Sequence, residues 1–195
     1  DIAYHYDKLV TRGFDKAINV LGADHHGYVP RLKAALEALG VDSGKLDVVL
    51  MQMVRLLRNG EVAKLSKRSG KAITLVTLLE EIPIDAARFF FNMREANSQF
   101  EFDLDLAVEQ SSQNPVYYVQ YAHARLCSLI TNLKADGLAD DVNANLELLD
   151  TEREIELIRH IASLPTEVNN AARTYDPAKI TKYVSHNEKV ARVVD

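Results

Sequence analysis

The sequence has a single cysteine, Cys127, so an internal disulfide is impossible. Its setting, ARLCSLI, predicts a small side chain buried on a helix face rather than a nucleophile. No apolar run approaches the ~18 residues that a membrane span requires. The first ten residues, DIAYHYDKLV, lack the basic and apolar regions of a signal peptide. These absences exclude a membrane-embedded class and favour a reducing, cytoplasmic location.

The chain also lacks an overall positive charge, because its net charge is −5. This balance argues weakly against a protein that coats nucleic acid. The charges are unevenly spread, however: residues 55–71 hold six Lys or Arg and one acid, whereas residues 135–156 hold eight acids and one base. Since a ligand responds to charges within about 8–10 Å in physiological salt, a local phosphate-binding patch at 55–71 is compatible with the acidic total.

Short apolar runs alternate with amphipathic stretches in the first hundred residues. Residues 17–22 (AINVLG) and 47–54 (DVVLMQMV) are predicted strands. Residues 30–39 between them form a predicted helix, with Pro30 in the first turn and Gly40 just beyond the end. The order of strand, helix and strand predicts part of an α/β unit with parallel strands.

Helices are predicted for the rest of the chain. Two follow the basic segment, one over residues 74–81 and one over AARFFFNMR with Asp85 as its N-cap. No convincing strand occurs after Asn114, and helix starts are recognisable at Asn114-Pro115, at the capping box of Thr151 with Glu154, and at Asp176-Pro177. The sequence therefore predicts an α/β domain over residues 1–106 and an all-α bundle over residues 107–195.

The stretch LGADHHGY follows the first predicted strand and precedes the helix. In parallel α/β sheets ligands bind beyond the carboxyl ends of strands, where Gly22 would let a ligand approach the backbone and Asp24 could accept hydrogen bonds from a ribose. His25 and His26 raise the possibility of a metal, but adjacent residues point in different directions and no ligand cluster lies nearby. No metal site is therefore predicted.

The heptad KLSKRSG, residues 64–70, carries two ammonium groups and a guanidinium. It is either a solvated basic loop or a polar, mobile loop that holds a triphosphate. It is not a P-loop, because the G-x-x-x-x-G-K-[ST] pattern is absent.

A third constellation is NPVYYVQYAHAR, residues 114–125. Tyr118, Tyr121 and Arg125 lie at i, i+3 and i+7, so they share one helix face. Such a face can stack unpaired bases, at roughly 1–3 kcal/mol per base, but a tyrosine stripe of this spacing is also common in a helical core.

Together, these stretches resemble class I arginyl-tRNA synthetases in order and spacing. KLSKRSG is similar to the class I KMSKS signature, and GADHHGY resembles the family's adenosine-binding segment after a Rossmann strand. AARFFFNMR and NPVYYVQYAHAR resemble runs of the bacterial enzymes, and NPVYYVQYAHAR with GADHHGYVPRL indicates arginine as the amino acid. The resemblance covers about residues 1–184.

The resemblance implies a reaction and a fold. L-Arginine would be activated with ATP and Mg²⁺, which are substrate rather than bound cofactor, and then transferred to tRNA(Arg). Residues 1–106 would be part of a Rossmann-type nucleotide-binding fold, and residues 107–195 an incomplete anticodon-binding bundle. A monomer without membrane attachment is expected.

The same resemblance implies roles for individual residues. Lys67 would stabilise the triphosphate while Lys64 and Ser66 shape the same loop. Asp1 would bind the substrate guanidinium, which suits a carboxylate because it can accept paired N–H bonds. The implied ATP-ribose set is Gly22, Asp24 and His25, and the implied anticodon set is Tyr118, Tyr121 and Arg125.

The chain also departs from the family pattern. The class I HIGH sequence and the tyrosine expected just before Asp1 are absent, and residues 185–195 do not match the family's usual stretch. The chain is therefore predicted to be a fragment that does not form arginyl-adenylate alone. Two alternatives stay open: another class I synthetase, such as the cysteine or glutamate enzyme, and a helical tRNA-binding module without catalysis.

Overall fold

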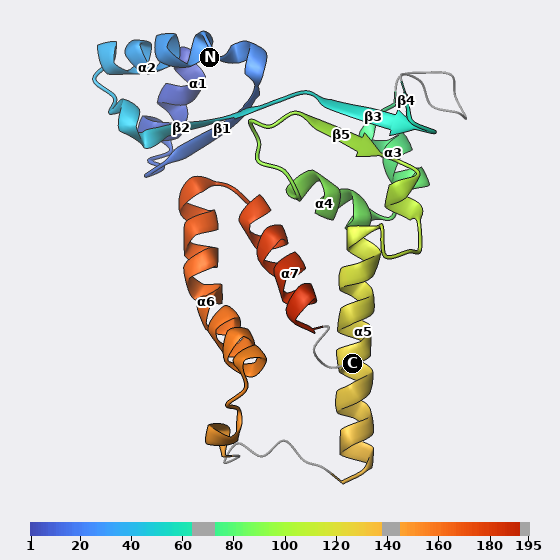
Figure 1. The fold of residues 1–195 in the computed structure, drawn as a ribbon. Coiled ribbons are helices and arrows are strands. Elements are labelled where there is room, and N and C mark those ends of the chain that lie inside the picture. Colours follow the sequence, from blue (N-terminus) through green and yellow to red (C-terminus); the bar gives the residue numbers. More distant parts are fainter. Residues whose placement is uncertain (64–72, 138–144, 192–195) are drawn as a thin grey trace. The chain divides into compact units, whose positions relative to one another are not determined.

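The computed structural model describes residues 1–63, 73–137 and 145–191 (Figure 1). The basic heptad lies outside these ranges. Contacts divide the chain into two compact units. The first unit is Asp1–Arg55 with Glu95–Glu101, and the second is Leu56–Arg94 with Phe102–Asp195. The domain division expected from the sequence, after residue 106, is based on the change from an α/β pattern to helices alone and not on contacts. It therefore stays a prediction.

The first unit contains the predicted α/β element. Strands β1 (Ala17–Gly22) and β2 (Leu46–Met51) pair in parallel, with Ala17 opposite Leu46 and Gly22 opposite Met51. Helix α2 (Tyr28–Ala38) connects them, and the short helix α1 (Ile2–Tyr6) precedes them. The prediction of parallel strands is confirmed, although β2 ends at Met51 rather than at Val54.

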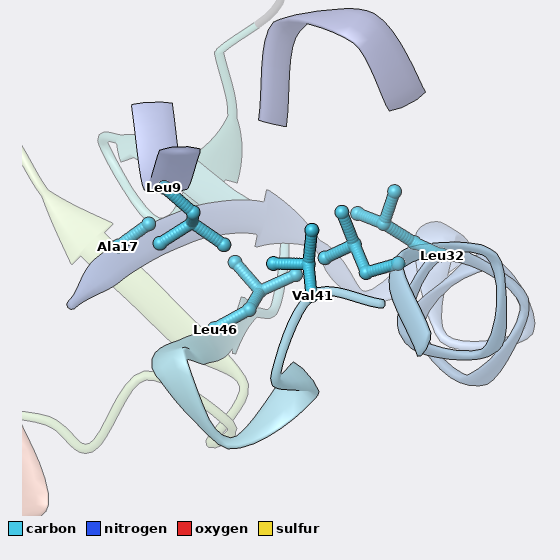
Figure 2. Close-up of a cluster of buried hydrophobic side chains, with 6 residues drawn as sticks. Leu9, Ala17, Leu32, Val41 and Leu46 are labelled. Carbon is cyan, nitrogen blue, oxygen red and sulfur yellow. The ribbon is translucent and has the colours of Figure 1, made fainter. Parts of the chain in front are cut away.

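A small apolar core holds this unit together (Figure 2). Figure 2 shows side chains from β1, β2 and α2 converging. The partly buried Tyr28 and Val48 pack against this cluster. Burial of each large aliphatic side chain contributes about 1.5–3 kcal/mol. The core consists of Leu9, Ala17, Leu32, Leu36, Val41 and Leu46.

A three-stranded sheet with the order β4-β3-β5 was not predicted. Strands β3 (Val54–Arg58) and β4 (Glu61–Val62) are antiparallel and are joined by Asn59-Gly60, both with positive φ. This dipeptide is the preferred type I′ hairpin turn. The third strand is β5 (Phe100–Asp103).

Two short helices, α3 (Leu75–Glu81) and α4 (Ile84–Asn92), confirm the predicted pair. The assignment of Asp85 as N-cap is wrong, because Pro83 occupies that position and Asp85 lies in the first turn of α4. There its carboxylate still interacts favourably with the positive end of the helix dipole. Phe90 and Phe91 of α4 contact the fully buried Phe102, with ring centroids 5.2 and 5.1 Å apart.

Three longer helices follow: α5 (Pro115–Ala135), α6 (Glu152–Thr174) and α7 (Ala178–Ala191). All three predicted starts are confirmed. Asn114 caps α5 by accepting a hydrogen bond from the Val116 amide, and Thr151 with Glu154 forms the capping box of α6. Within residues 114–137 and 145–191 there is no strand. None of the described helices is both long and apolar enough to cross a membrane.

Helices α5 and α6 expose many apolar side chains. Cys127 lies on the exposed half of α5, so the prediction of a buried cysteine is wrong. The prediction that Cys127 lies in a helix is correct. The burial was wrong because the apolar side chains around Cys127 are themselves exposed. These exposed side chains are Leu126, Leu129, Ile130 and Leu133 on α5, and Ile158, Ile161, Leu164 and Val168 on α6.

Candidate nucleotide and RNA sites

The predicted nucleotide-binding residues lie at the carboxyl end of β1. Gly22 is the last residue of the strand, and a short 3₁₀ turn, Ala23–His25, follows it. A Cβ atom at Gly22 would lie 2.5 Å from Asp24 Oδ1, so any other residue here would displace the carboxylate. The glycine therefore keeps both the strand end and the Asp24 side chain in this arrangement.

Asp24 and His25 are both available to a ligand. Their side chains are 82% and 53% exposed, and His25 Nε2 lies 3.8 Å from Asp24 Oδ2. This contact is long and exposed, so it contributes little to stability and leaves the carboxylate able to accept hydrogen bonds. Among the residues that the structure describes, no group of three His, Cys, Asp or Glu is arranged to hold a metal ion.

Asp1 is linked to this surface through Tyr28. The Tyr28 hydroxyl donates a hydrogen bond to Asp1 Oδ2 at 3.0 Å. The ring of Tyr28 packs against the core of the first unit and meets the His25 ring edge to face, with centroids 6.3 Å apart. A series of contacts thus connects the predicted guanidinium ligand, Asp1, with the predicted ribose ligand, Asp24.

Tyr28 was not singled out from the sequence. The available signal was its position as the first residue of α2, directly after the GADHHG stretch. Its ring belongs to the edge of the core while its hydroxyl orients a carboxylate. Tyr28 therefore connects the packed core of the first unit with the predicted site.

His5 contacts the backbone of Asp1 and was also not singled out from the sequence. It is buried, with Nδ1 2.8 Å from the Asp1 carbonyl oxygen and Nε2 2.6 Å from Asn19 Nδ2. A neutral ring satisfies both contacts, since Nδ1–H donates to the carbonyl and Nε2 accepts from the amide. Burial is the main cause that lowers the pKa of His5, and the neighbouring Lys8 lowers it further. His5 is thus a neutral bridge between α1 and β1.

Lys64, Ser66 and Lys67 lie outside the described residues, so their predicted role stays a prediction. The flanking structure is defined on both sides. Strand β4 precedes the segment, and the capping box of Thr74 with Thr77 begins α3 after it. The segment therefore connects a strand of the sheet to a capped helix.

The aromatic face of α5 is partly exposed. The Tyr121 side chain is 49% exposed, and the Arg125 guanidinium lies 5.8 Å from its ring centroid. Tyr117 stacks on Tyr121, with centroids 6.3 Å apart and planes 15° apart. A row of Tyr117, Tyr121 and Arg125 therefore forms at i, i+4 and i+8, and Tyr117 and Tyr118 are both half-buried. The i, i+4 spacing of Tyr117 and Tyr121 was the signal for this row.

Comparisons with known proteins give consistent results. Residues 119–189 match the DALR anticodon binding domain. The chain is 55% identical over 186 residues to the arginine–tRNA ligase of Caldanaerobacter subterraneus subsp. tengcongensis, and 54% identical over 186 residues to that of Ruminiclostridium cellulolyticum. Each match covers 94% of this chain and 33% of the relative. The chain thus spans about one third of the length of these curated relatives.

Solved structures give the same result. The structure resembles an arginyl-tRNA synthetase structure from Campylobacter jejuni with a TM-score of 0.85 and 35% identity, over 100% of this chain and 42% of that chain. It resembles the Thermus thermophilus arginyl-tRNA synthetase with a TM-score of 0.71 over 91% of this chain and 32% of that chain. At 20% identity, this second likeness concerns the fold alone.

These matches confirm the predicted fold class, an α/β part followed by an anticodon-binding helical part. They also confirm that the chain corresponds to only part of a synthetase. By sequence and by structure, the chain is similar to about one third of the length of arginine–tRNA ligases, and residues 119–189 match an anticodon binding domain.

Proposed function

We propose that this chain serves as one third of an arginine–tRNA ligase. In the reaction, the arginine carboxylate attacks the α-phosphate of ATP–Mg²⁺ and releases pyrophosphate. The terminal adenosine of tRNA(Arg) then takes the arginyl group and AMP leaves. The observation that carries this proposal is the series of contacts from Asp1 through Tyr28 and His25 to Asp24, at the carboxyl end of a parallel strand.

Each residue of this surface has a role that its chemistry allows. The Asp1 carboxylate would accept paired N–H bonds from the substrate guanidinium, with Tyr28 holding one of its oxygens in place. Asp24 would accept hydrogen bonds from the ATP ribose, and Gly22 would let the nucleotide approach the backbone. Lys67 would stabilise charge on the triphosphate, with Lys64 and Ser66 in the same loop.

The helical part would bind tRNA(Arg). Support comes from the match of residues 119–189 to an anticodon-binding domain and from the exposed ring of Tyr121 beneath Arg125. An exposed aromatic ring with a neighbouring guanidinium can stack unpaired anticodon bases. Tyr118 would contribute from the half-buried edge of this face. We also propose that the protein is a monomer located in the cytoplasm.

The test requires a chain long enough to catalyse. We would replace the matching third of the Caldanaerobacter enzyme with this chain and measure arginine-dependent ATP–pyrophosphate exchange with tRNA(Arg) present. The chimera should be active, whereas this chain alone should not be. Lys67→Ala should slow exchange by roughly 100- to 1000-fold, because a charge that stabilises the transition state is lost.

Binding of tRNA separates the alternatives. Lys67→Ala should change the dissociation constant for tRNA(Arg) much less than it changes exchange. If exchange is unaffected while tRNA binding persists, the basic heptad has no catalytic role and a binding module becomes the better description. Charging with another amino acid in place of arginine would instead indicate a different class I enzyme.

A further inference from the structure

The carboxylate of Asp1 has two competing uses in the first unit. Asp1 is the N-cap residue of α1, and Asp is one of the residue types that favour this position, because its side chain can accept hydrogen bonds from free helix amides. The carboxylate nevertheless makes no capping hydrogen bond to the amides of α1, all of which the structure describes. It accepts a hydrogen bond from the Tyr28 hydroxyl instead, at 3.0 Å. The contact with Tyr28 thus takes the place of a helix cap.

The backbone of Asp1 is fixed, whereas its side chain is exposed and can rotate. The His5 amide donates to the Asp1 carbonyl oxygen at 3.0 Å, and His5 Nδ1 lies 2.8 Å from the same oxygen. Because His5 is buried, these contacts hold the Asp1 backbone in place. Rotation of the side chain alone would therefore move the carboxylate between Tyr28 and the amides of α1.

Tyr28 contacts both predicted substrate-binding regions. It is the first residue of α2, a helix that lies against α1 in the first unit (Figure 1). Its hydroxyl faces Asp1, and its ring meets the His25 ring edge to face, with planes 78° apart. His25 ends the exposed turn that carries Asp24, and its Nε2 lies 3.8 Å from Asp24 Oδ2. A ligand that orders this turn would also restrict the Tyr28 ring.

A guanidinium would distinguish the two orientations of the Asp1 carboxylate. A carboxylate has about four acceptor positions, and the Tyr28 hydroxyl uses one of them, so the others remain open to paired N–H donors. In the capping orientation the amides of α1 would occupy the carboxylate and compete with the ligand. Arginine would therefore bind more tightly to one orientation, and this difference in affinity is what coupling between two ligands requires.

We propose that Tyr28 is a positioning residue that makes the binding of arginine and of ATP interdependent. A ribose bound at Asp24 would order the turn that carries His25, and the contact between the two rings would keep the Tyr28 hydroxyl directed at Asp1. The carboxylate would then be held away from the cap of α1 and open to the guanidinium. The inference rests on the proposed function, to which it adds a coupling that separate binding roles do not imply.

The experiment uses a chimera in which this chain replaces the matching third of the Caldanaerobacter enzyme. Calorimetric titration gives the dissociation constant of L-arginine with and without a saturating, non-hydrolysable ATP analogue. It also gives the dissociation constant of the analogue with and without arginine. Each ligand should strengthen binding of the other by the same factor, about fivefold or more, because coupling between two binding sites is reciprocal.

Tyr28→Phe keeps the ring and removes the hydroxyl. It should weaken arginine binding about tenfold, change binding of the analogue alone less than about twofold, and reduce the coupling factor to less than about twofold. A general loosening of the first unit would instead weaken both ligands and leave the factor unchanged. The matched control is Tyr4→Phe, which removes the hydroxyl of a tyrosine that is 58% exposed on α1. It should leave both dissociation constants and the factor unaltered.

His25→Leu tests the other half of the series. This variant removes the contact between the two rings and leaves the hydrogen bond from Tyr28 to Asp1 in place. The coupling factor should fall to less than about twofold, and adding Tyr28→Phe should reduce it no further, because both residues would act through the same contacts. Melting curves show whether each variant is folded, and His25→Leu decides the question if Tyr28→Phe is not.

The outcomes separate the two proposals. If the chimera catalyses exchange but arginine and the analogue bind independently, the inference is wrong and the proposed function stands. The same holds if Tyr28→Phe and His25→Leu keep the coupling factor of the unsubstituted chimera. If the chimera catalyses no exchange and binds neither ligand, the inference and the proposed function fail together.

Discussion

The two compact units differ in how their apolar side chains are used. In the first unit, Leu36 and Leu46 are completely buried between α2 and the parallel strands. In the second, Leu129 of α5 and Ile158 of α6 remain 41% and 46% exposed. The comparison shows two ways to position a candidate site. Tyr28 is fixed by a core, whereas Tyr121 is positioned by the helix on which it lies.

The largest change in the free energy of unfolding should appear when Leu36 is replaced. Leu36→Ala would leave a cavity in a closely packed cluster and lower the free energy of unfolding of the first unit by about 2–5 kcal/mol. Hydrogen exchange of the β1 and β2 amides, read by mass spectrometry, would report this loss. The control is Leu39→Ala, just beyond α2, where the side chain is 51% exposed. Similar losses for both variants would show that the cluster is not the stabilising core.

A smaller loss is expected at Asn114 in the second unit. This buried side chain accepts a hydrogen bond from the Val116 amide and donates one to the Glu109 carbonyl oxygen at 2.8 Å. Asn114→Ala removes the cap and leaves buried backbone groups without these bonds, so about 1–3 kcal/mol should be lost. Urea denaturation measures this effect. Gln113→Ala, at the exposed neighbouring position, should change stability by less than about 0.5 kcal/mol.

A smaller difference in stability between the two units is expected when the pH is lowered. Burial lowers the pKa of His5 from its usual value of 6.5, so below pH 6.5 the unfolded chain binds a proton that the folded first unit does not. The stability of this unit should therefore fall as the pH drops below 6.5, by no more than about 1.4 kcal/mol per pH unit. In the second unit, hydrogen bonds from Thr151 lower the pKa of Glu154 from 4.5, so its contribution is lost only at more acidic pH.

Hydrogen exchange at pH 7.5, 6.5 and 5.5 would test this separation. Amides of the first unit should lose protection over this range while those near the start of α6 do not. His5→Gln should remove most of the dependence, whereas His123→Gln, at an exposed position on α5, should not. Equal pH dependence in both units would show that His5 is not the group responsible.

Local signals in the sequence predicted most elements but not their long-range partners. Asn114 and Thr151 marked helix starts because caps act on amides two or three residues away. The β4-β3-β5 sheet was missed because β5 begins at Phe100, 46 residues after the start of β3 at Val54. The bond from Tyr28 to Asp1 joins residues 27 apart and follows from how α2 packs on the core. Such contacts depend on the fold, so no short motif specifies them.

The smallest effect should occur on α5. Leu129→Ser changes a side chain that is 41% exposed, so the free energy of unfolding should change by less than about 0.5 kcal/mol. Urea denaturation of Leu129→Ser and of Leu36→Ala under the same conditions would compare the loss of stability in the two units directly. A loss of about 2 kcal/mol or more at Leu129 would mean that this side chain is buried in solution. The exposed face of α5 would then be a packed surface, and the contrast between the two units would not hold.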